Sequence, residues 1–363
     1  MFFKYCIRLG ILFGFVGLIY GFLMLPFLFK NKEQDAKTLR IYTWANRIDE
    51  SVLQDFEQKT GIKVYLNYYE SVEELLTKLE VMPSLDCDIM LPSNYVIARM
   101  IDAGLIKKLD RSRCSFMKKI YSQFLHNDVD PNNEYSVPLY WDIFGIGYNA
   151  NIIAKNQIDL RLLFDKNAII GQEVGMTDEP REAIFLTAQY LGLDLNHLTS
   201  FDLKKIRQVL RMQKSWVGAY SDSQQGYFLG TETFAIAASD REIICRQMLK
   251  NDFVKFAMLP AGSMLRIDSI VMNAATKKDD LIYQFLEFLF SYDVLLSHCE
   301  KYCILPTSRE VFQDLDEKYI GVQNLYPGSA EFNTLVTFNL GLSQKEINDF
   351  WIHTTPLGNT QGF

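Results

Sequence analysis

Along most of the chain, hydrophobic positions recur with the period of a strand in some segments and with the period of a helix in others. Residues 39–44, LRIYTW, have the composition of a strand, and DESVLQDFEQKTG at 49–61 places Leu53 and Phe56 on one face of a helix. Gly61 suits the position just after that helix, where the backbone is commonly left-handed. These patterns predict a strand and then a helix at the start of the ordered body.

Strand-like and helix-like segments then follow each other at close spacing. Ser71 and Glu74 have the spacing of a capping box, which predicts the start of a helix in VEELLTKLE. Strands separated by single helices are typical of parallel β–α–β units in an α/β sheet. The segments of this first set are 62–69 as a strand, 72–80 as a helix, 87–92 as a strand and 94–104 as a helix.

A second set of segments continues the pattern to the end of the chain. It contains two short strand-like pieces around Trp141 and a turn, TDEPRE, that leads from a strand-like start into a helix. Residues 281–299, LIYQFLEFLFSYDVLLSHC, have the periodicity of one long helix. The remaining segments are 134–153 around Trp141, 168–192 around the turn, strands at 253–260 and 266–273, ILPTSREV at 304–311, and a helix at about 344–354.

Three turns between a strand and the next helix contain aromatic or hydroxyl side chains. Trp44 follows the first strand, residues 69–71 follow the second and residues 93–95 follow the third. Ligands bind at the carboxyl ends of the strands in such sheets, so these turns indicate a site at one edge. Each residue alone would more often be a packing residue. Asp178, Glu179 and Glu182 lie on a further turn, TDEPRE, just as a helix starts, where acidic residues can also simply offset the helix dipole.

The first 36 residues differ from the rest. Residues 9–29 form a run of 21 without a charge, preceded by Lys4 and Arg8. A helix of this length spans roughly 30 Å, the hydrocarbon thickness of a bilayer, and cations before it predict a cytoplasmic N-terminus. We therefore interpret residues 1–36 as an uncleaved membrane anchor, with an unusually apolar signal peptide as the alternative.

Composition and charge are those of an ordinary globular protein. The chain has 363 residues, which suggests two domains, with 48% hydrophobic and 22% charged residues. Its net charge of −7 does not indicate a nucleic-acid-binding surface. The cysteines after the N-terminal segment are odd in number and irregular in spacing, which describes no disulfide framework. His298, Cys299 and Cys303 fit a helix end with buried thiols better than a metal site, so we expect neither metal nor cofactor.

No catalytic motif is recognisable, and we do not expect an enzyme. The four histidines are scattered, and the sequence contains no GxSxG, P-loop or zincin pattern. Asp178, Glu179 and Glu182 could imitate the carboxylate pair of a glycosidase. They lie on one turn, however, without a partner across a substrate.

A series of short stretches resembles the periplasmic polyamine-binding proteins, the spermidine/putrescine receptors of ABC importers in the bacterial extracellular solute-binding protein family. The stretches are YTW, YES, DIMLPSNY, GLIKKLD, DPNNEYSVP, TDEPRE, IDSI and LPTS, and DPNN-x-YS-x-P is the most specific. The resemblance runs from about Leu39 to the C-terminus. It implies an α/β, two-lobed periplasmic-binding-protein fold of type II, with mixed sheets, helices on both faces and a ligand enclosed by hinge motion.

The resemblance also implies an organisation and partners. Lobe 1 is expected at 37–143 with 264–306, and lobe 2 at 144–263 with 307–363. The protein would act in the periplasm as a monomer, tethered to the inner membrane through 9–29. It would capture a polyamine such as spermidine or putrescine and deliver it to an ABC permease with its ATPase.

Eight ligand-binding residues follow from transferring the family's positions onto this sequence. Ammonium groups need carboxylates, and a methylene chain needs aromatic walls. Trp44 matches an aromatic wall, and Ser93 and Tyr95 match a hydroxyl–aromatic turn. Three carboxylates match ammonium-binding positions, with two arginines among them. These five residues are Glu179, Glu182, Asp268, Arg47 and Arg266.

Several positions depart from the polyamine-binding pattern. Arg47 and Arg266 stand where aromatic residues are usual, and an arginine 4 Å from an ammonium would disfavour binding by about 4 kcal/mol at an effective dielectric constant near 20. These arginines could pair with the carboxylates, bind a carboxylate on the ligand, or point outward. A receptor for an amino-carboxylate or another small ligand, and a non-transporting sensor or scaffold, therefore remain alternatives. The other departures are Ala45, Ala238, Leu305, with Tyr302 as a nearby substitute, and Thr337.

Overall fold

The computed structural model describes residues 14–15, 17–22, 37–69, 72–81, 86–168, 173–338, 340, 342 and 344–354. Most of the segment expected to cross a membrane at 9–29 lies outside these residues, as does Ser71 of the expected capping box. Within the part of the chain that is described, no helix has both the length and the apolar character needed to cross a membrane.

The described strands form one mixed sheet of ten strands. Their bounds are β1 Thr38–Thr43, β2 Lys63–Tyr68, β3 Ile89–Met90, β4 Ser136–Asn149, β5 Glu173–Met176, β6 Val217–Tyr220, β7 Phe234–Asp240, β8 Val254–Ala257, β9 Met264–Met272 and β10 Leu305–Pro306. Along the sheet the order is β2-β1-β3-β9-β4-β7-β5-β6, and β8 and β10 also pair with β4. At one end of the sheet, the strands β1 to β3 pair in parallel, and at the other end the strands β5 to β7 pair in parallel. Between these ends lie β9 and β4, which are antiparallel to each other.

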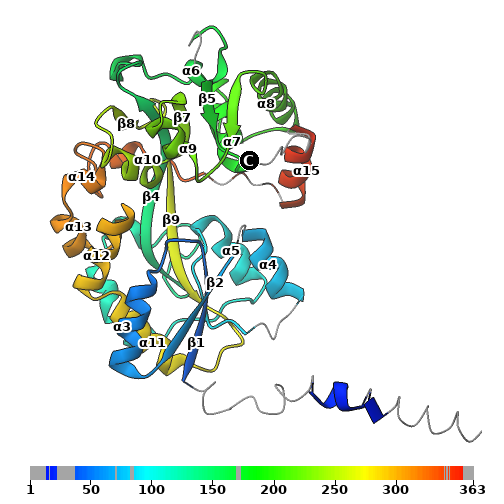
Figure 1. Ribbon diagram of the computed structural model, residues 1–363, viewed down its shortest axis with the longest axis vertical. Coiled ribbons are helices and arrows are strands. Elements are labelled where there is room, and N and C mark those ends of the chain that lie inside the picture. The colour runs from blue at the N-terminus through cyan, green and yellow to red at the C-terminus, as the bar shows by residue number, and fades with distance from the viewer. Residues whose placement is uncertain are drawn as a thin grey trace, which may run out of the picture.

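Helices cover the two halves of this sheet and give the molecule two lobes joined by the long strands β4 and β9 (Figure 1). The first lobe holds β1 to β3, and the second holds β5 to β8. The helices are α3 Glu50–Thr60, α4 Val72–Val81, α5 Ile97–Asp102, α6 Arg161–Phe164, α7 Pro180–Tyr190, α8 Ser200–Gln213, α9 Gln225–Gly230, α10 Arg241–Met248, α11 Asp279–Leu289, α12 Tyr292–Tyr302, α13 Arg309–Asp314, α14 Glu317–Ile320 and α15 Gln344–Thr354.

Apolar residues on the two faces of the first lobe pack against different helices. Ile41 of β1 and Phe56 of α3 belong to the largest core cluster, where the Phe56 ring lies 5.2 Å from that of Phe285 in α11. Met90 of β3 packs on the opposite face with Leu75 of α4. Full burial of one such side chain contributes about 1.5–3 kcal/mol, so the periodic apolar positions hold the sheet between its helices.

The helix expected at 49–61 is confirmed, with both of its ends. Asp49 precedes α3, and its carboxylate accepts a hydrogen bond from the backbone N–H of Ser51 (2.9 Å). Gly61 ends the helix with a left-handed backbone (φ 72°), a conformation that glycine adopts without a side-chain clash. This helix fixes where the chain leaves the turn after β1.

Two expected elements have different boundaries in the structure. The two strand-like pieces around Trp141 are one continuous strand, β4, because partners on both edges and a fully buried environment suit its apolar run. The long helix expected at 281–299 is two helices, α11 and α12. Ser291 separates them in an extended conformation (φ −68°, ψ 146°), and its hydroxyl donates to the carbonyl of Phe288 (2.6 Å).

A buried ion pair fastens the middle of β4 to the second lobe. Arg241, at the start of α10, is fully buried and donates to Asp142 of β4 (2.7 Å). The same guanidinium donates to the backbone carbonyls of Tyr319 (2.8 Å), Ile320 (3.0 Å) and Cys303. Arg241 therefore joins β4, α10, α14 and the end of α12 near the connection between the lobes.

Replacing Arg241 by methionine should lower the free energy of unfolding by about 3–5 kcal/mol, because Asp142 is left buried without a counter-charge. Urea denaturation followed by circular dichroism at pH 7 measures the change. Arg161→Gln is the matched control, since Arg161 pairs with Asp159 (3.1 Å) at the solvent-exposed surface and its removal should leave the urea midpoint unchanged. A loss below about 1 kcal/mol for Arg241→Met would contradict this account of the buried pair.

Candidate functional site

A cavity of about 860 Å³ lies between the two lobes. It is lined by the turns after β1 and β3, the first turn of α7, the residues at 222–227, the end of β7 with α10, and the start of β9. The structure brings together at this cavity all eight residues that the sequence singles out. These are Trp44, Arg47, Ser93, Tyr95, Glu179, Glu182, Arg266 and Asp268.

The turn after β1 directs Trp44 and Arg47 to the cavity. Asn46 between them has a left-handed backbone (φ 63°), a conformation that asparagine tolerates better than most residues. Trp44 is half-buried and packs edge-on against Tyr69, with ring centroids 4.6 Å apart. Part of its ring is left to face the cavity, so Trp44 is not a fully buried core residue.

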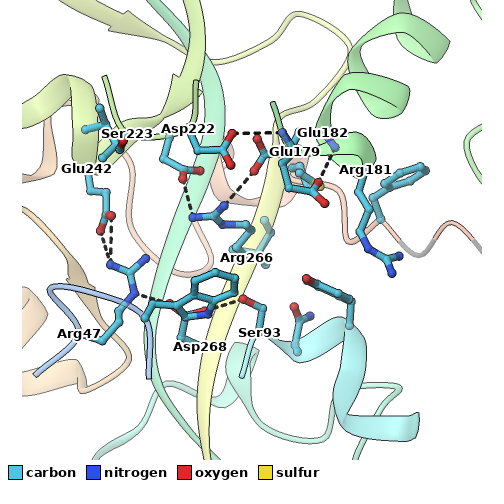
Figure 2. Close-up of a pocket in the computed structure, with 18 of the residues that line it drawn as sticks. Arg47, Ser93, Glu179, Arg181, Glu182, Asp222, Ser223, Glu242, Arg266 and Asp268 are labelled. Carbon is cyan, nitrogen blue, oxygen red and sulfur yellow. Dashed lines mark hydrogen bonds and ion pairs between the residues drawn. The ribbon is translucent and has the colours of Figure 1, made fainter. Parts of the chain in front are cut away.

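Arg47 is buried and lies between carboxylates from both lobes (Figure 2). Its Nε donates to Asp268 Oδ2 of β9 (2.7 Å), and its Nη1 donates to both oxygens of Glu242 in α10 (2.8 and 3.0 Å). Burial alone would lower the pKa of Arg47, but Glu242 and Asp268 outweigh it and raise the pKa above its ordinary value. Ser93 donates to the other oxygen of Asp268 (2.8 Å).

Arg266 occupies the cavity in the same way from the strand β9. Its Nη1 donates to Glu182 (2.9 Å), and its Nη2 donates to Asp240 at the end of β7 (2.6 Å). The hydroxyl of Thr177 contacts the second oxygen of Glu182 (2.6 Å). Of the three orientations considered for the two arginines, pairing with the carboxylates is therefore the one observed.

Carboxylates still outweigh cations on the second-lobe wall. Burial raises the pKa of Asp240 to about 7, although the neighbouring Arg266 lowers it. Burial and the nearby Asp240 raise the pKa of Glu182 well above its ordinary value. Asp222 is accessible from the cavity, but the surrounding protein and the adjacent Asp178 raise its pKa to about 7. Burial is the main cause of these raised pKa values, and neighbouring carboxylates add to it.

One carboxylate oxygen on this wall has no partner. Asp240 is 9% exposed, and its Oδ1 has no hydrogen-bond partner among the described residues, whereas Oδ2 accepts from Arg266. A buried acceptor without a partner costs free energy, on the order of 1–3 kcal/mol. Asp240 lines the cavity, and a rotation of its carboxylate would bring this buried oxygen to a donor on a ligand.

The stretch DPNNEYSVP at 130–138 shapes the rim of the cavity. Asp130 is buried, and its carboxylate accepts hydrogen bonds from the backbone N–H groups of Glu134, Tyr135 and Ser136, each at 2.9 Å. For these N–H groups, the carboxylate of Asp130 takes the place of backbone carbonyl acceptors. It fixes the preceding residues 127–129, which line the cavity.

An aromatic contact between the lobes closes another side of the cavity. The guanidinium of Arg181 in α7 lies 4.6 Å from the ring centroid of Tyr95, which belongs to the turn after β3. Cation–π contacts of this kind contribute about 0.5–2 kcal/mol. Together with Arg47 and Glu242, this contact ties the first lobe to the second across the cavity.

The other departures from the polyamine-binding pattern have different outcomes. Ala45 and Thr337 line the cavity. Ala238 and Leu305 are fully buried in strands β7 and β10, and Tyr302 packs against His298 with ring centroids 4.8 Å apart. These three residues are not among those that line the cavity, so they do not alter its aromatic wall.

Sequence reasoning missed Asp222, Asp240 and Glu242. Asp240 and Glu242 follow the carboxyl end of β7, which is the position that identified Trp44 after β1. The stretch FAIAASDRE contains this signal as an apolar strand followed by acidic residues. Asp222 follows β6 in the same manner. Applying the same rule to these two strands would have found all three residues.

Comparisons with known proteins agree with this architecture. A family model described as bacterial extracellular solute-binding protein matches residues 51–320. The spermidine/putrescine-binding periplasmic protein of Salmonella typhimurium is 25% identical over 321 residues, which cover 87% of this chain and 88% of that protein. The putrescine-binding periplasmic protein PotF of Escherichia coli is 29% identical over 283 residues, covering 72% and 75%.

Among solved structures, the spermidine/putrescine ABC transporter substrate-binding protein PotD from Streptococcus pneumoniae has the same fold. Its TM-score is 0.73 at 23% sequence identity, with 88% of this chain and 98% of that chain covered. This likeness confirms the two-lobed, periplasmic-binding-protein fold of α/β class.

Proposed function

The chain belongs to the bacterial extracellular solute-binding protein family, and we propose that it captures a small amine of the polyamine class in the interlobe cavity and delivers it to an ABC permease. The observation that supports this most directly is the acid-rich wall around Asp240, whose buried Oδ1 has no hydrogen-bond donor in the part of the chain that the structure describes. Relatives of this chain are named for binding putrescine and spermidine in the periplasm. Its family is one of solute-binding proteins rather than of enzymes.

The charges along the cavity favour a cationic ligand. Among the described residues, seven carboxylates and five cationic side chains line it, an excess of two acidic groups. An ammonium group forms charge-assisted hydrogen bonds with carboxylates, which are about twice as strong as neutral ones. The half-buried rings of Trp44 and Tyr95 supply surfaces for a methylene chain. We assign the eight sequence-selected residues, with Asp222, Asp240 and Glu242, to this binding site.

Lobe motion about the two connecting strands would admit and enclose the ligand. We retain the expected boundaries, with lobe 1 at 37–143 and 264–306 and lobe 2 at 144–263 and 307–363. Strands β4 and β9 both pass from one lobe to the other. Their course supports one change of lobe within β4 and another near the start of β9.

Location and partners follow from the same proposal. The protein would act in the periplasm as a monomer and dock on a permease that is driven by an ATPase. The uncharged run at 9–29, preceded by Lys4 and Arg8, supports a tether to the inner membrane.

The structure removes the support for the amino-carboxylate alternative. It rested on Arg47 and Arg266 being available to an anion. Each of these arginines already lies between two carboxylates, so an additional anion would meet net negative charge at both places. The sensor or scaffold alternative has no observation in its favour.

Isothermal titration of the full-length chain with putrescine and spermidine at pH 8 tests the proposed function. At least one amine should bind with a Kd of about 10 µM or lower, corresponding to about −7 kcal/mol. 1,4-Butanediol is the matched control, because it has the length of putrescine without the charges and should not bind. A folded sample that gives no heat with either amine would remove the proposal.

Amine affinity should rise by about tenfold between pH 6 and pH 8. Asp240 and Asp222 have pKa values of about 7 without ligand, and a bound ammonium favours their ionised forms. Binding therefore releases protons, and release of one proton changes affinity by up to tenfold per pH unit. The measurement is titration at half-unit steps of pH.

The variant Asp240→Asn should lower the affinity and flatten this pH profile. Asp159→Asn is the control, since Asp159 is a surface carboxylate that pairs with Arg161 away from the cavity. An affinity that stays constant or falls as the pH rises from 6 to 8 would show that these carboxylates do not contact the amine.

A further inference from the structure

Two guanidinium groups of the protein stand where ligand cations would be expected. Arg47 holds Asp268 and Glu242, and Arg266 holds Glu182 and Asp240. Asp268 and Glu182 are two of the three carboxylates that match ammonium-binding positions of the polyamine-binding pattern. Arginines of the chain itself therefore pair with most of the carboxylates that a polyamine would use.

The hydrogen bonds show that both oxygens of Asp268 are already engaged. Its Oδ2 accepts from Arg47 and its Oδ1 accepts from Ser93 (2.8 Å). Glu182 accepts from Arg266 at one oxygen, and its other oxygen shares the single hydroxyl hydrogen of Thr177 with Asp222. An ammonium at either carboxylate would share it with an arginine that is attached to the chain, or would have to displace that arginine.

Asp240 differs from these two carboxylates. Only its Oδ2 is engaged by Arg266, and its buried Oδ1 has no partner among the described residues. Asp222 and Glu179 line the cavity near Glu182. Burial raises the pKa of Glu182, and the three neighbouring carboxylates of Asp240, Asp222 and Glu179 raise it further. The open position for an ammonium is therefore the wall at Asp240, on the second lobe.

Arg47 also makes the connection between lobes that a bound polyamine could otherwise make. It belongs to the turn after β1 in the first lobe, and Glu242 belongs to α10 in the second (Figure 2). Both residues are buried, with side-chain exposures of 7% and 8%. A cation of the chain itself thus bridges the two lobes at this end of the cavity.

We propose that Arg47 fills, from within the chain, the cationic position beside Asp268, so that the cavity selects short primary amines that place one ammonium at Asp240 over triamines such as spermidine. This inference rests on the proposed function and names the class of amine. Arg47 is then the specificity-determining residue, and Arg266 keeps Glu182 occupied in the same way.

Size does not account for this selection. The cavity of about 860 Å³ lies within the range of pockets that hold drug-sized ligands, so it has room for a triamine. Charge is the distinguishing property. A second or third ammonium would lie near Arg47 or Arg266, where like charges repel, unless it displaced one of them.

The test compares butylamine, putrescine and spermidine by isothermal titration of the full-length chain at pH 8. In the wild type, spermidine should bind no more tightly than putrescine, and butylamine should bind within tenfold of putrescine. Arg47→Gln leaves Asp268 and Glu242 without their cation. In this variant the affinity for spermidine, relative to butylamine, should rise at least tenfold.

Two further variants control for charge and for the general loss of an arginine. Arg47→Lys keeps a cation at this position, and the ratio of spermidine to butylamine affinity should stay within threefold of the wild-type ratio. Arg113→Gln removes an arginine that pairs with Asp280 (2.7 Å) on the surface, and it should leave all three affinities unchanged.

The outcomes separate this inference from the proposed function. Wild-type binding of spermidine more than tenfold tighter than putrescine would overturn the inference and leave the proposed function standing. So would an unchanged ratio in folded Arg47→Gln. Absence of binding by all three amines would overturn both. If Arg47→Gln does not fold, the wild-type order of the three amines decides the question.

Discussion

Buried charge in the interlobe cavity must be balanced within the protein, and this requirement organises the centre of the molecule. Arg47 and Asp268 are each 6% exposed, and an ion that is buried without a partner costs several kcal/mol. Arg47 and Arg266 therefore each lie between two carboxylates, which come from β9, α10, α7 and the end of β7. The site is complete only when these segments meet, so the placement of β9 beside β3 and β4 is a condition for the site as well as for the sheet.

The ion pairs set the charge that a ligand meets more than they set stability. Buried ion pairs are often replaceable by apolar residues without loss of stability, because desolvation offsets much of their attraction. What the arrangement fixes is which acceptors are occupied. Two arginines against four carboxylates leave acidic groups in excess, and burial, with Asp142 and Glu242 nearby, raises the pKa of Asp240. A ligand with an ammonium group supplies the missing counter-charge.

Local patterns predicted much of the fold and part of the site. The helix ending at Gly61 and the residues in the turns after β1 and β3 follow from periodicity and from the rule that ligands bind at strand ends. The break at Ser291 did not follow, since α11 and α12 bury apolar residues in the same core cluster and their combined sequence keeps one period. The pairing of Arg47 with Glu242 joins residues 195 positions apart, and no local pattern encodes a contact at that separation.

A cation that is attached to the chain has an advantage over a free ligand in competing for the same carboxylates. A group held on the same chain acts at an effective concentration that reaches the millimolar range, so Arg47 remains between Asp268 and Glu242 when amines are present at micromolar concentration. A free amine gains most by binding where no internal cation has satisfied the acceptor, which is Oδ1 of Asp240. The family resemblance therefore predicts the kind of ligand, whereas the position of Arg47 determines how many of its charges the cavity can use. Two chains with the same fold and the same carboxylates can differ in the amine they select through a single arginine.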